Sequence, residues 1–232
     1  MSQFVILCDH ASNHVPPELR DLGLPSAELG RHIAWDIGAA GIATELSRIF
    51  DAPAILCPTS RLVIDCNRQL DARDLIPEIS DGTEIPGNQG LNGQQKAGRI
   101  DRWFHTYHDA VESLISEQGS PIVLSIHTMT PVLDGSVRPW QIALSSFDDR
   151  SLVDPVLHAL RAPGDITVGD NQPYDLDPAV DYSIPFHAMR RGLDYLQVEF
   201  RQDEVQTPAG QVKWARRFAQ AIVKSGLQSR AS

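Results

Sequence analysis

The feature that most constrains this chain is the alternation of short apolar runs with longer amphipathic segments. The apolar runs have the length and composition of buried strands, and they occupy residues 4–8, 54–57, 62–64, 121–126, 141–144 and 195–198. The amphipathic segments repeat apolar residues at helical intervals, and they occupy residues 27–50, 92–117, 150–161 and 208–226. This alternation predicts an α/β fold, in which helices cover both faces of a mostly parallel or mixed sheet.

The length of the chain favours a single domain over residues 1–232. A chain of 232 residues suits one large α/β domain with a well-buried core, and neither an internal repeat nor a Pro/Ser-rich linker divides it. Residues 70–90 and 163–185 are predicted to be loop-like. Long loops in compact domains are often functional, which makes residues 70–90 a candidate part of a binding site.

The charge balance restricts the partners that we expect. The chain carries 20 basic and 30 acidic residues, a formal net charge of -10. Such a surface repels nucleic acid and anionic lipid, so we expect neither as a partner. A small anionic substrate remains compatible with it, because a few arginines in a cleft reverse the local sign of the charge.

Cysteine usage and the amino terminus predict a cytoplasmic protein. Cys8, Cys57 and Cys66 are odd in number and lack CxxC spacing, which disfavours a disulfide framework and fits a reducing compartment. The first residues lack the basic and apolar regions of a signal peptide. No apolar stretch approaches the length that spans a bilayer, so we expect no membrane association.

Three predicted strands end in side chains that carry chemistry. Asp9 and His10 follow the first strand, His127 follows residues 121–126, and Glu199 follows the last strand. Ligands of open α/β sheets bind at the carboxyl ends of the strands, where these groups would meet. Two imidazoles and one further ligand are a common catalytic zinc pattern, and Glu199 would then suit the role of general base. Hydrogen-bonded structural histidines are an equally good interpretation of the residues alone.

The third metal ligand stays open between Asp36, His14, Asn13 and water. His14 lies four residues after His10 but in a proline-flanked loop, and amides such as Asn13 are poor zinc ligands. Asp36 lies on an apolar stretch of the predicted first helix, where a carboxylate must be ligated or paired. A salt bridge to Arg61 or Arg68 is an equally good alternative to ligation. A His-His-carboxylate set binds zinc, iron or manganese.

A second polar cluster surrounds the predicted strand at 62–64. Arg61 and Arg68 bracket this strand, and Asn67 is adjacent. Guanidinium groups bind carboxylates bidentately, and Arg or Asn side chains also stabilise a developing oxyanion. The alternative is a surface ion pair with Asp65 or Asp71, which the residues by themselves favour.

Arg201 follows Glu199 by two residues, so in a strand both side chains lie on the same face. Arg201 is therefore predicted either to bind substrate or to neutralise Glu199 or Asp203. His187 is predicted to be a satisfied loop histidine. The remaining histidines are predicted to be surface or packing residues: His32, His105, His108 and His158.

Other enzyme classes lack their sequence signals. The chain has no GxSxG elbow, no Walker A loop and no GxGxxG after a strand. Two alternatives to a metal hydrolase remain: a non-catalytic small-molecule binder that retains the pocket, and a thiol enzyme that uses Cys8.

Taken in order, six segments resemble the N-formylglutamate amidohydrolase (deformylase) family. They are CDHASNHVP at 8–16, AWDIGA at 34–39, SRLVIDCNR at 60–68, IPGN at 85–88, HTMTP at 127–131 and VEFRQD at 198–203. SRLVIDCNR and the segment that begins at Glu199 are the most specific. The segments span nearly the whole chain.

The resemblance implies a phosphorylase/hydrolase-like α/β fold similar to zinc exopeptidases and aspartoacylase. It implies zinc on His10 and His127, a substrate contact from Asn67 and Arg68, and a general base at Glu199. The implied reaction is hydrolysis of a small anionic N-acyl amino acid, N-formylglutamate included. The glutamate ligand of those relatives has no counterpart in this HASN-type sequence.

From these arguments we adopt one set of candidate residues. It comprises His10, Asp36 and His127 for the metal, Glu199 for catalysis, and Arg61, Asn67, Arg68 and Arg201 for the substrate.

Overall fold

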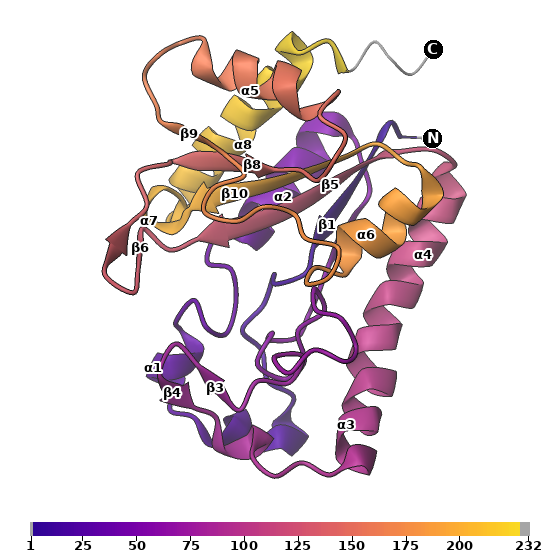
Figure 1. The fold of residues 1–232 in the computed structure, drawn as a ribbon, viewed down its shortest axis with the longest axis vertical. Helices are drawn as coiled ribbons and strands as arrows, with labels where there is room; N and C mark the ends of the chain where they lie inside the picture. The colour runs from indigo at the N-terminus through magenta and orange to yellow at the C-terminus, as the bar shows by residue number, and fades with distance from the viewer. Residues whose placement is uncertain (1, 228–232) are drawn as a thin grey trace.

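The computed structural model describes residues 2–227 and is organised around a six-stranded sheet (Figure 1). The strand order is β2-β1-β5-β10-β8-β9. The strands are β1 (Phe4–Cys8), β2 (Ala54–Leu56), β5 (Ile122–Met129), β8 (Ile142–Ser145), β9 (Val168–Asp170) and β10 (Tyr195–Arg201). Only the β10–β8 pair is antiparallel; the other neighbouring strands run parallel. The predicted fold class, a mostly parallel mixed sheet in an α/β protein, is confirmed.

Helices cover both faces of the sheet and enclose two apolar cores. The first face packs against α2 (Ala39–Phe50), α5 (Val153–Arg161) and α8 (Pro208–Lys224). The second face packs against α4 (Thr106–Gln118) and α6 (Ser183–His187), which lie together in Figure 1. Among residues 2–227, no helix is long and apolar enough to cross a membrane.

The remaining elements are short. They are η1 (Pro17–Gly23), α1 (Ser26–Leu29), β3 (Ile79–Ser80), β4 (Thr83–Glu84), η2 (Pro86–Asn88), α3 (Gly93–Arg99), the π-helical η3 (Ile100–His105), β6 (Val132–Leu133), β7 (Ser136–Val137), η4 (Met189–Arg191) and α7 (Gln202–Val205). The α1, β3 and β4 segments lie at the lower end of Figure 1, away from α5 and α8.

The second face of the sheet changes from apolar to polar along the central strands. On β5, Val123 belongs to the apolar core of this face, whereas Ser125 and His127 continue the same face as buried polar residues. On β10, Gln197 and Glu199 are likewise buried polar residues on this face, and Glu199 is the register partner of His127. Side-chain alternation therefore places a polar patch at the carboxyl ends of β5 and β10, while the opposite face stays apolar.

The predicted helix at 27–50 is wrong in its central part. Residues 30–38 form turns, and α2 begins only at Ala39, after Gly38 with φ of +90°. The apolar residues on the two sides of this break pack on opposite faces of the sheet. Ile33 belongs to the core of the second face and Ile42 to that of the first, so one straight helix could not bury both.

Three further corrections concern loops and strand ends. Residues 62–64 form a buried turn and not a strand, with Val63 N donating to Ser60 O at 2.9 Å. The predicted loops contain regular structure: the β3–β4 hairpin lies within 70–90, β9 lies within 163–185, and α6 begins at Ser183, near the end of that range. His127 lies inside β5 rather than after it, because pairing with β10 extends β5 to Met129.

Candidate active site

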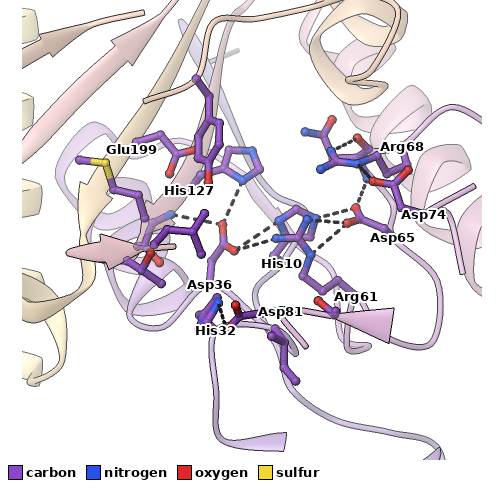
Figure 2. A pocket seen from close by; sticks show the side chains of 18 of the residues that line it. His10, His32, Asp36, Arg61, Asp65, Arg68, Asp74, Asp81, His127 and Glu199 are labelled. Atoms are coloured by element: carbon purple, nitrogen blue, oxygen red, sulfur yellow. Dashed lines mark hydrogen bonds and ion pairs between the residues drawn. The ribbon is translucent and has the colours of Figure 1, made fainter. Parts of the chain in front are cut away.

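A cavity of about 610 Å³ opens at the carboxyl ends of the central strands, and Figure 2 shows its lining side chains. Most of the residues predicted for the site line it: His10, Asp36, Arg61, Asn67, Arg68, His127 and Glu199. His32, predicted to be a surface or packing residue, also lines it.

Asp36 lies between the two histidines at the base of this cavity. Its Oδ1 lies 3.4 Å from His10 Nδ1, and its Oδ2 lies 3.1 Å from His127 Nδ1. One ligand atom from each of the three residues falls within 4.8 Å of the others, and all three are buried. The two imidazole rings point toward the carboxylate from either side, with centroids 5.3 Å apart (Figure 2).

Backbone contacts bring these distant segments together. The Asp36 N–H donates to the carbonyl of His10 at 2.9 Å, which ties the turn before α2 to the end of β1. The N–H of Thr128 donates to Asp36 Oδ2 at 3.2 Å, which ties the same turn to β5. Asp36 therefore reaches the site from a turn, since the helix predicted around it is broken there.

Further carboxylates orient the far side of each imidazole. His10 Nε2 donates to Asp65 Oδ1 at 2.7 Å. His127 Nε2 lies 3.0 Å from Ser125 Oγ and 3.5 Å from Asp9 Oδ2. A carboxylate such as Asp65 accepts hydrogen bonds and does not donate, so His10 carries its proton on Nε2 when neutral and turns its Nδ1 lone pair toward Asp36.

The cluster attracts positive charge. Burial lowers the pKa of His127, but hydrogen bonds to Asp36 and Asp9 outweigh it and hold the pKa well above its ordinary value. Burial and Arg61 lower the pKa of His10, yet Asp65 and Asp36 outweigh them and raise it. The carboxylates of this site therefore favour a cation next to both rings.

The donor set fits a divalent metal ion. Imidazole nitrogen and carboxylate oxygen are the ligands that zinc takes in catalytic sites. His10 Nδ1 is buried and has no hydrogen-bond partner among the described residues, as expected for a ligand atom. Carboxylates behind ligating imidazoles are the usual outer partners of metal sites.

Arg61 lies beside this cluster. Its Nε and Nη2 donate to Asp65 Oδ2 at 2.9 and 2.6 Å, and its Nη1 lies 3.5 Å from Asp36 Oδ1. The ion pair between Asp36 and Arg61, weighed above as an alternative to ligation, thus exists together with the histidine contacts. Arg61 places a positive charge at the edge of the candidate metal site.

Asn67 and Arg68 line the cavity, and both side chains form hydrogen bonds with other protein groups. Asn67 Nδ2 donates to Asp181 Oδ1 at 2.9 Å, and its Oδ1 accepts from the N–H groups of Tyr182 and Ser183, both at 3.0 Å. Arg68 Nε donates to Asp74 Oδ2 at 2.8 Å. Asn67 thus joins its own loop to the start of α6.

Glu199 projects into the cavity opposite His127. Its side chain is buried, and Oε2 has no hydrogen-bond partner in the part of the chain that the structure describes. Burial raises the pKa of Glu199 to about 7; His127 opposes this and Asp36 adds to it. A carboxyl group with such a pKa exchanges protons readily near neutral pH.

The remaining candidates lie outside this arrangement. Arg201 donates to Asp203 at 2.7 Å and to the Arg138 carbonyl at 3.2 Å, and it is not among the cavity-lining residues. His14 is exposed, and Asn13 Nδ2 donates to the Leu29 carbonyl at 2.9 Å. Neither belongs to the group that could hold a metal ion.

Cys8, the nucleophile of the alternative thiol mechanism, is fully buried in the apolar core of the first face. Burial raises the pKa of its thiol well above the ordinary value. A thiolate nucleophile needs the opposite shift.

Sequence reasoning missed two groups that shape the site. From the sequence, Asp65 is predicted only as an ion-pair partner of an arginine. Its place within SRLVIDCNR, one of the two most specific family segments, indicates a role in the site. Arg138 and Tyr174 line the cavity, but no local pattern distinguishes them from other loop residues.

The family to which this fold and site belong follows from comparison with known proteins. The family described as N-formylglutamate amidohydrolase matches residues 2–205. The chain belongs to this family. Comparison with curated proteins gives no match.

Solved structures share the fold. The crystal structure of gene product Atu2144 from Agrobacterium tumefaciens is 31% identical, with a TM-score of 0.93 over 100% of this chain and 92% of that one. N-formylglutamate amidohydrolase from Ralstonia eutropha JMP134 is 18% identical, with a TM-score of 0.61 over 100% and 95%. The CwlD amidase from Clostridioides difficile, solved with the GerS lipoprotein, is 12% identical, with a TM-score of 0.51 over 97% and 98%.

The last two likenesses concern the fold alone, whereas the family match extends to activity. The protein is an amidohydrolase that acts on amides of small molecules.

Proposed function

We propose that this amidohydrolase depends on a divalent metal ion and hydrolyses a small anionic N-acyl amino acid, with N-formyl amino acids such as N-formylglutamate included. The observation that carries the proposal is the buried group of His10, Asp36 and His127, whose ligand atoms lie within 4.8 Å of one another. Beside it lies Glu199, with a carboxylate oxygen that has no hydrogen-bond partner among residues 2–227.

In this proposal the metal would be held by His10, His127 and the Asp36 carboxylate, which the Nδ1 atoms of the two imidazoles face. Zinc is the expected ion, and iron or manganese suits the same ligands. When bound, the ion supplies Lewis-acid polarisation of the amide carbonyl. Asp65 and Asp9 keep the imidazoles oriented, because each faces the Nε2 atom of one of them.

Glu199 moves the proton. Its carboxylate accepts a proton from the water whose oxygen attacks the amide carbon, and it then donates that proton to the leaving nitrogen as the C–N bond breaks. The products are a carboxylic acid and a free amine. The raised pKa of Glu199 suits both halves of this transfer.

The cavity arginines bind the negative charge of the reactants. Arg61 lies next to Asp36 and is placed to stabilise the oxyanion that develops on the amide oxygen. Arg68, supported by Asn67, binds a carboxylate of the substrate from the cavity wall. Arg201 has no part in this mechanism, because it does not line the cavity.

We further propose that residues 1–232 form one catalytic domain of a cytoplasmic enzyme that needs neither nucleic acid nor a membrane. The chain length and the acidic net charge of -10 support this.

Elemental analysis of the purified protein, together with the Glu199→Gln variant, tests the mechanism. We expect about one metal ion per chain in both proteins and a loss of kcat of about 10²- to 10⁴-fold in the variant, the usual contribution of a general base. Glu117→Gln, on the exposed face of α4, is the matched control. Full activity of metal-free protein, or an active Glu199→Gln enzyme, would contradict the proposal.

A further inference from the structure

Three arginines line the active-site cavity, and Arg138 differs from the other two in its partners. Arg61 is paired with Asp65 and Asp36, and Arg68 is paired with Asp74. Arg138 is more deeply buried, with 7% exposure, and no carboxylate of residues 2–227 forms an ion pair with it. Of the three cavity arginines, Arg138 is therefore the one without an ion-pair partner among the described carboxylates.

Neutral groups hold this guanidinium in place. Nη1 donates to Thr130 Oγ1 at 3.2 Å, and Nη2 donates to the Tyr174 hydroxyl at 2.6 Å. The guanidinium carbon lies 4.9 Å from the centroid of the Tyr174 ring, a cation–π contact. The backbone N–H of Arg138 also donates to the Pro131 carbonyl at 2.9 Å, which ties the arginine to the end of β5.

Arg99 shows how the same chain treats an arginine with a purely structural role. It is buried to a similar degree, with 5% exposure, and no carboxylate in the described part of the chain forms an ion pair with it. Its guanidinium donates to three oxygens, those of Val63, Gly87 and the Asn88 side chain, and it does not line the cavity. Arg138 has two hydroxyl acceptors and faces the cavity, so it keeps donors for a ligand.

The hydroxyl groups of Thr130 and Tyr174 also offer hydrogen bonds to a bound anion. Thr130 and Tyr174 accept from Arg138 through oxygen lone pairs, so each retains its own O–H as a donor. Both side chains line the cavity. A buried cation is costly without a counter-ion, and a ligand carboxylate would supply that counter-ion through paired, charge-assisted hydrogen bonds.

We propose that Arg138, together with Tyr174 and Thr130, forms the subsite that binds a carboxylate of the substrate. The proposal rests on the proposed function, since it concerns the same cavity and an anionic substrate. Because Asp74 already pairs with Arg68, Arg138 contributes more to carboxylate binding than Arg68 does. Arg138 thereby determines specificity for acidic over neutral N-acyl compounds.

Kinetics on substrates that differ in one carboxylate test the subsite. The substrates are N-formylglutamate and its two monoamides, with the amide at the side chain or at the α-carboxyl. For N-formylglutamate, we expect Arg138→Gln to raise KM at least about 30-fold with little change in kcat, because it removes one partner of a buried charge pair. For the monoamide that lacks the carboxylate bound at Arg138, the same variant changes KM less than about threefold.

Control variants separate binding from folding. Arg48→Gln removes an arginine from the exposed end of α2, where it pairs with Glu45, and leaves KM unchanged. Arg138→Lys keeps the charge without the bidentate fork, so its KM falls between those of wild type and Arg138→Gln. An equal effect of Arg138→Gln on all three substrates would overturn the proposal.

Calorimetric titration of N-formylglutamate into Glu199→Gln, with and without Arg138→Gln, separates the subsite from the activity. If wild type hydrolyses none of the substrates but binding still depends on Arg138, the proposed function fails and the subsite stands. If hydrolysis proceeds while Arg138→Gln alters neither KM nor binding, the subsite fails and the function stands. Absence of both hydrolysis and binding overturns both.

Discussion

His108 and His187 form a buried pair beside the active-site loop, and both are held neutral. His108 Nδ1 lies 2.9 Å from His187 Nε2, and His108 Nε2 lies 2.9 Å from the Cys66 carbonyl. Burial lowers the pKa of His108 to about 3, and His187 adds to the effect. Burial also lowers the pKa of His187 to about 4. Glu112 lies 3.6 Å from His187 Nδ1, but it is half-exposed and ion-paired with Arg191, so burial prevails.

These shifts predict a loss of stability on acidification. Between the ordinary histidine pKa of 6.5 and about 4, the unfolded chain binds protons at both residues and the native protein does not. The free energy of unfolding therefore falls as the pH falls, by about 1.4 kcal/mol per pH unit for each histidine. From pH 6.5 to pH 5, each histidine accounts for a loss of about 2 kcal/mol.

The loss has a local origin that bears on the active site. Cys66, whose carbonyl accepts from His108, lies between Asp65 and Asn67 in the loop that supports His10. Because His108 Nε2 donates to the Cys66 carbonyl, Nδ1 of neutral His108 accepts from His187 Nε2. Protonation of His108 removes this acceptor, so the contact between the two imidazoles becomes repulsive next to the residue that anchors the loop. We therefore expect acid to loosen the outer support of the candidate metal site as well as the fold.

Urea denaturation between pH 5 and pH 6.5 measures the effect in wild type, in His187→Gln and in the exposed control His158→Gln. Groups common to two proteins cancel in the difference between their unfolding free energies. Wild type minus His187→Gln should therefore change by about 1.4 kcal/mol per pH unit, and His158→Gln should behave as wild type. Equal pH slopes for wild type and His187→Gln would refute the reasoning.

Three further predictions address the metal site and the backbone that positions it. Asp65→Asn should weaken metal binding about 10- to 100-fold in a competition assay with a chromophoric chelator, because His10 loses its carboxylate partner. Zinc at about 100 times its Kd should stabilise chelator-treated wild type by about 2.7 kcal/mol, seen as a rise in Tm; a similar rise in Asp36→Ala would count against that ligand. Gly38→Ala should lower the free energy of unfolding by at least about 2 kcal/mol, since φ is +90° and a Cβ would lie 2.5 Å from the Val205 carbonyl oxygen. Gly98→Ala, where a Cβ meets open space in α3, should leave stability unchanged or slightly raised.

Much of the candidate site could be predicted because it follows the strands of the sheet. A parallel sheet brings the carboxyl ends of β1, β5 and β10 to one edge, so His10, His127 and Glu199 were expected together before their distances were known. A carboxylate on an apolar stretch and an arginine beside a predicted strand added Asp36 and Arg61 from segments between these strands. The cavity contains all five residues.

The parts that sequence reasoning could not reach depend on contacts between remote segments. Arg201 shares a strand face with Glu199, yet its register partner Met129 is the last residue of β5, so Arg201 projects beyond the cavity toward Asp203. Arg138 enters the cavity because the chain folds back onto Pro131 and Tyr174 arrives from a separate loop. Local periodicity in the sequence predicts neither the position of Arg201 nor that of Arg138.

The amino-acid sequence by itself determined the elements and the chemistry that they carry. Apolar runs and amphipathic segments specify strands and helices through local periodicity, and the polar residues near the carboxyl ends of the strands specify the reactive groups. Only the tertiary structure decided where the segment from 27 to 50 is divided. It also decided with which residue each charged side chain forms an ion pair. The two halves of the segment bury apolar side chains on opposite faces of the sheet, so the chain turns at Gly38 and delivers Asp36 between two histidines. That choice depends on burial against residues far away in the sequence, which local propensity does not encode.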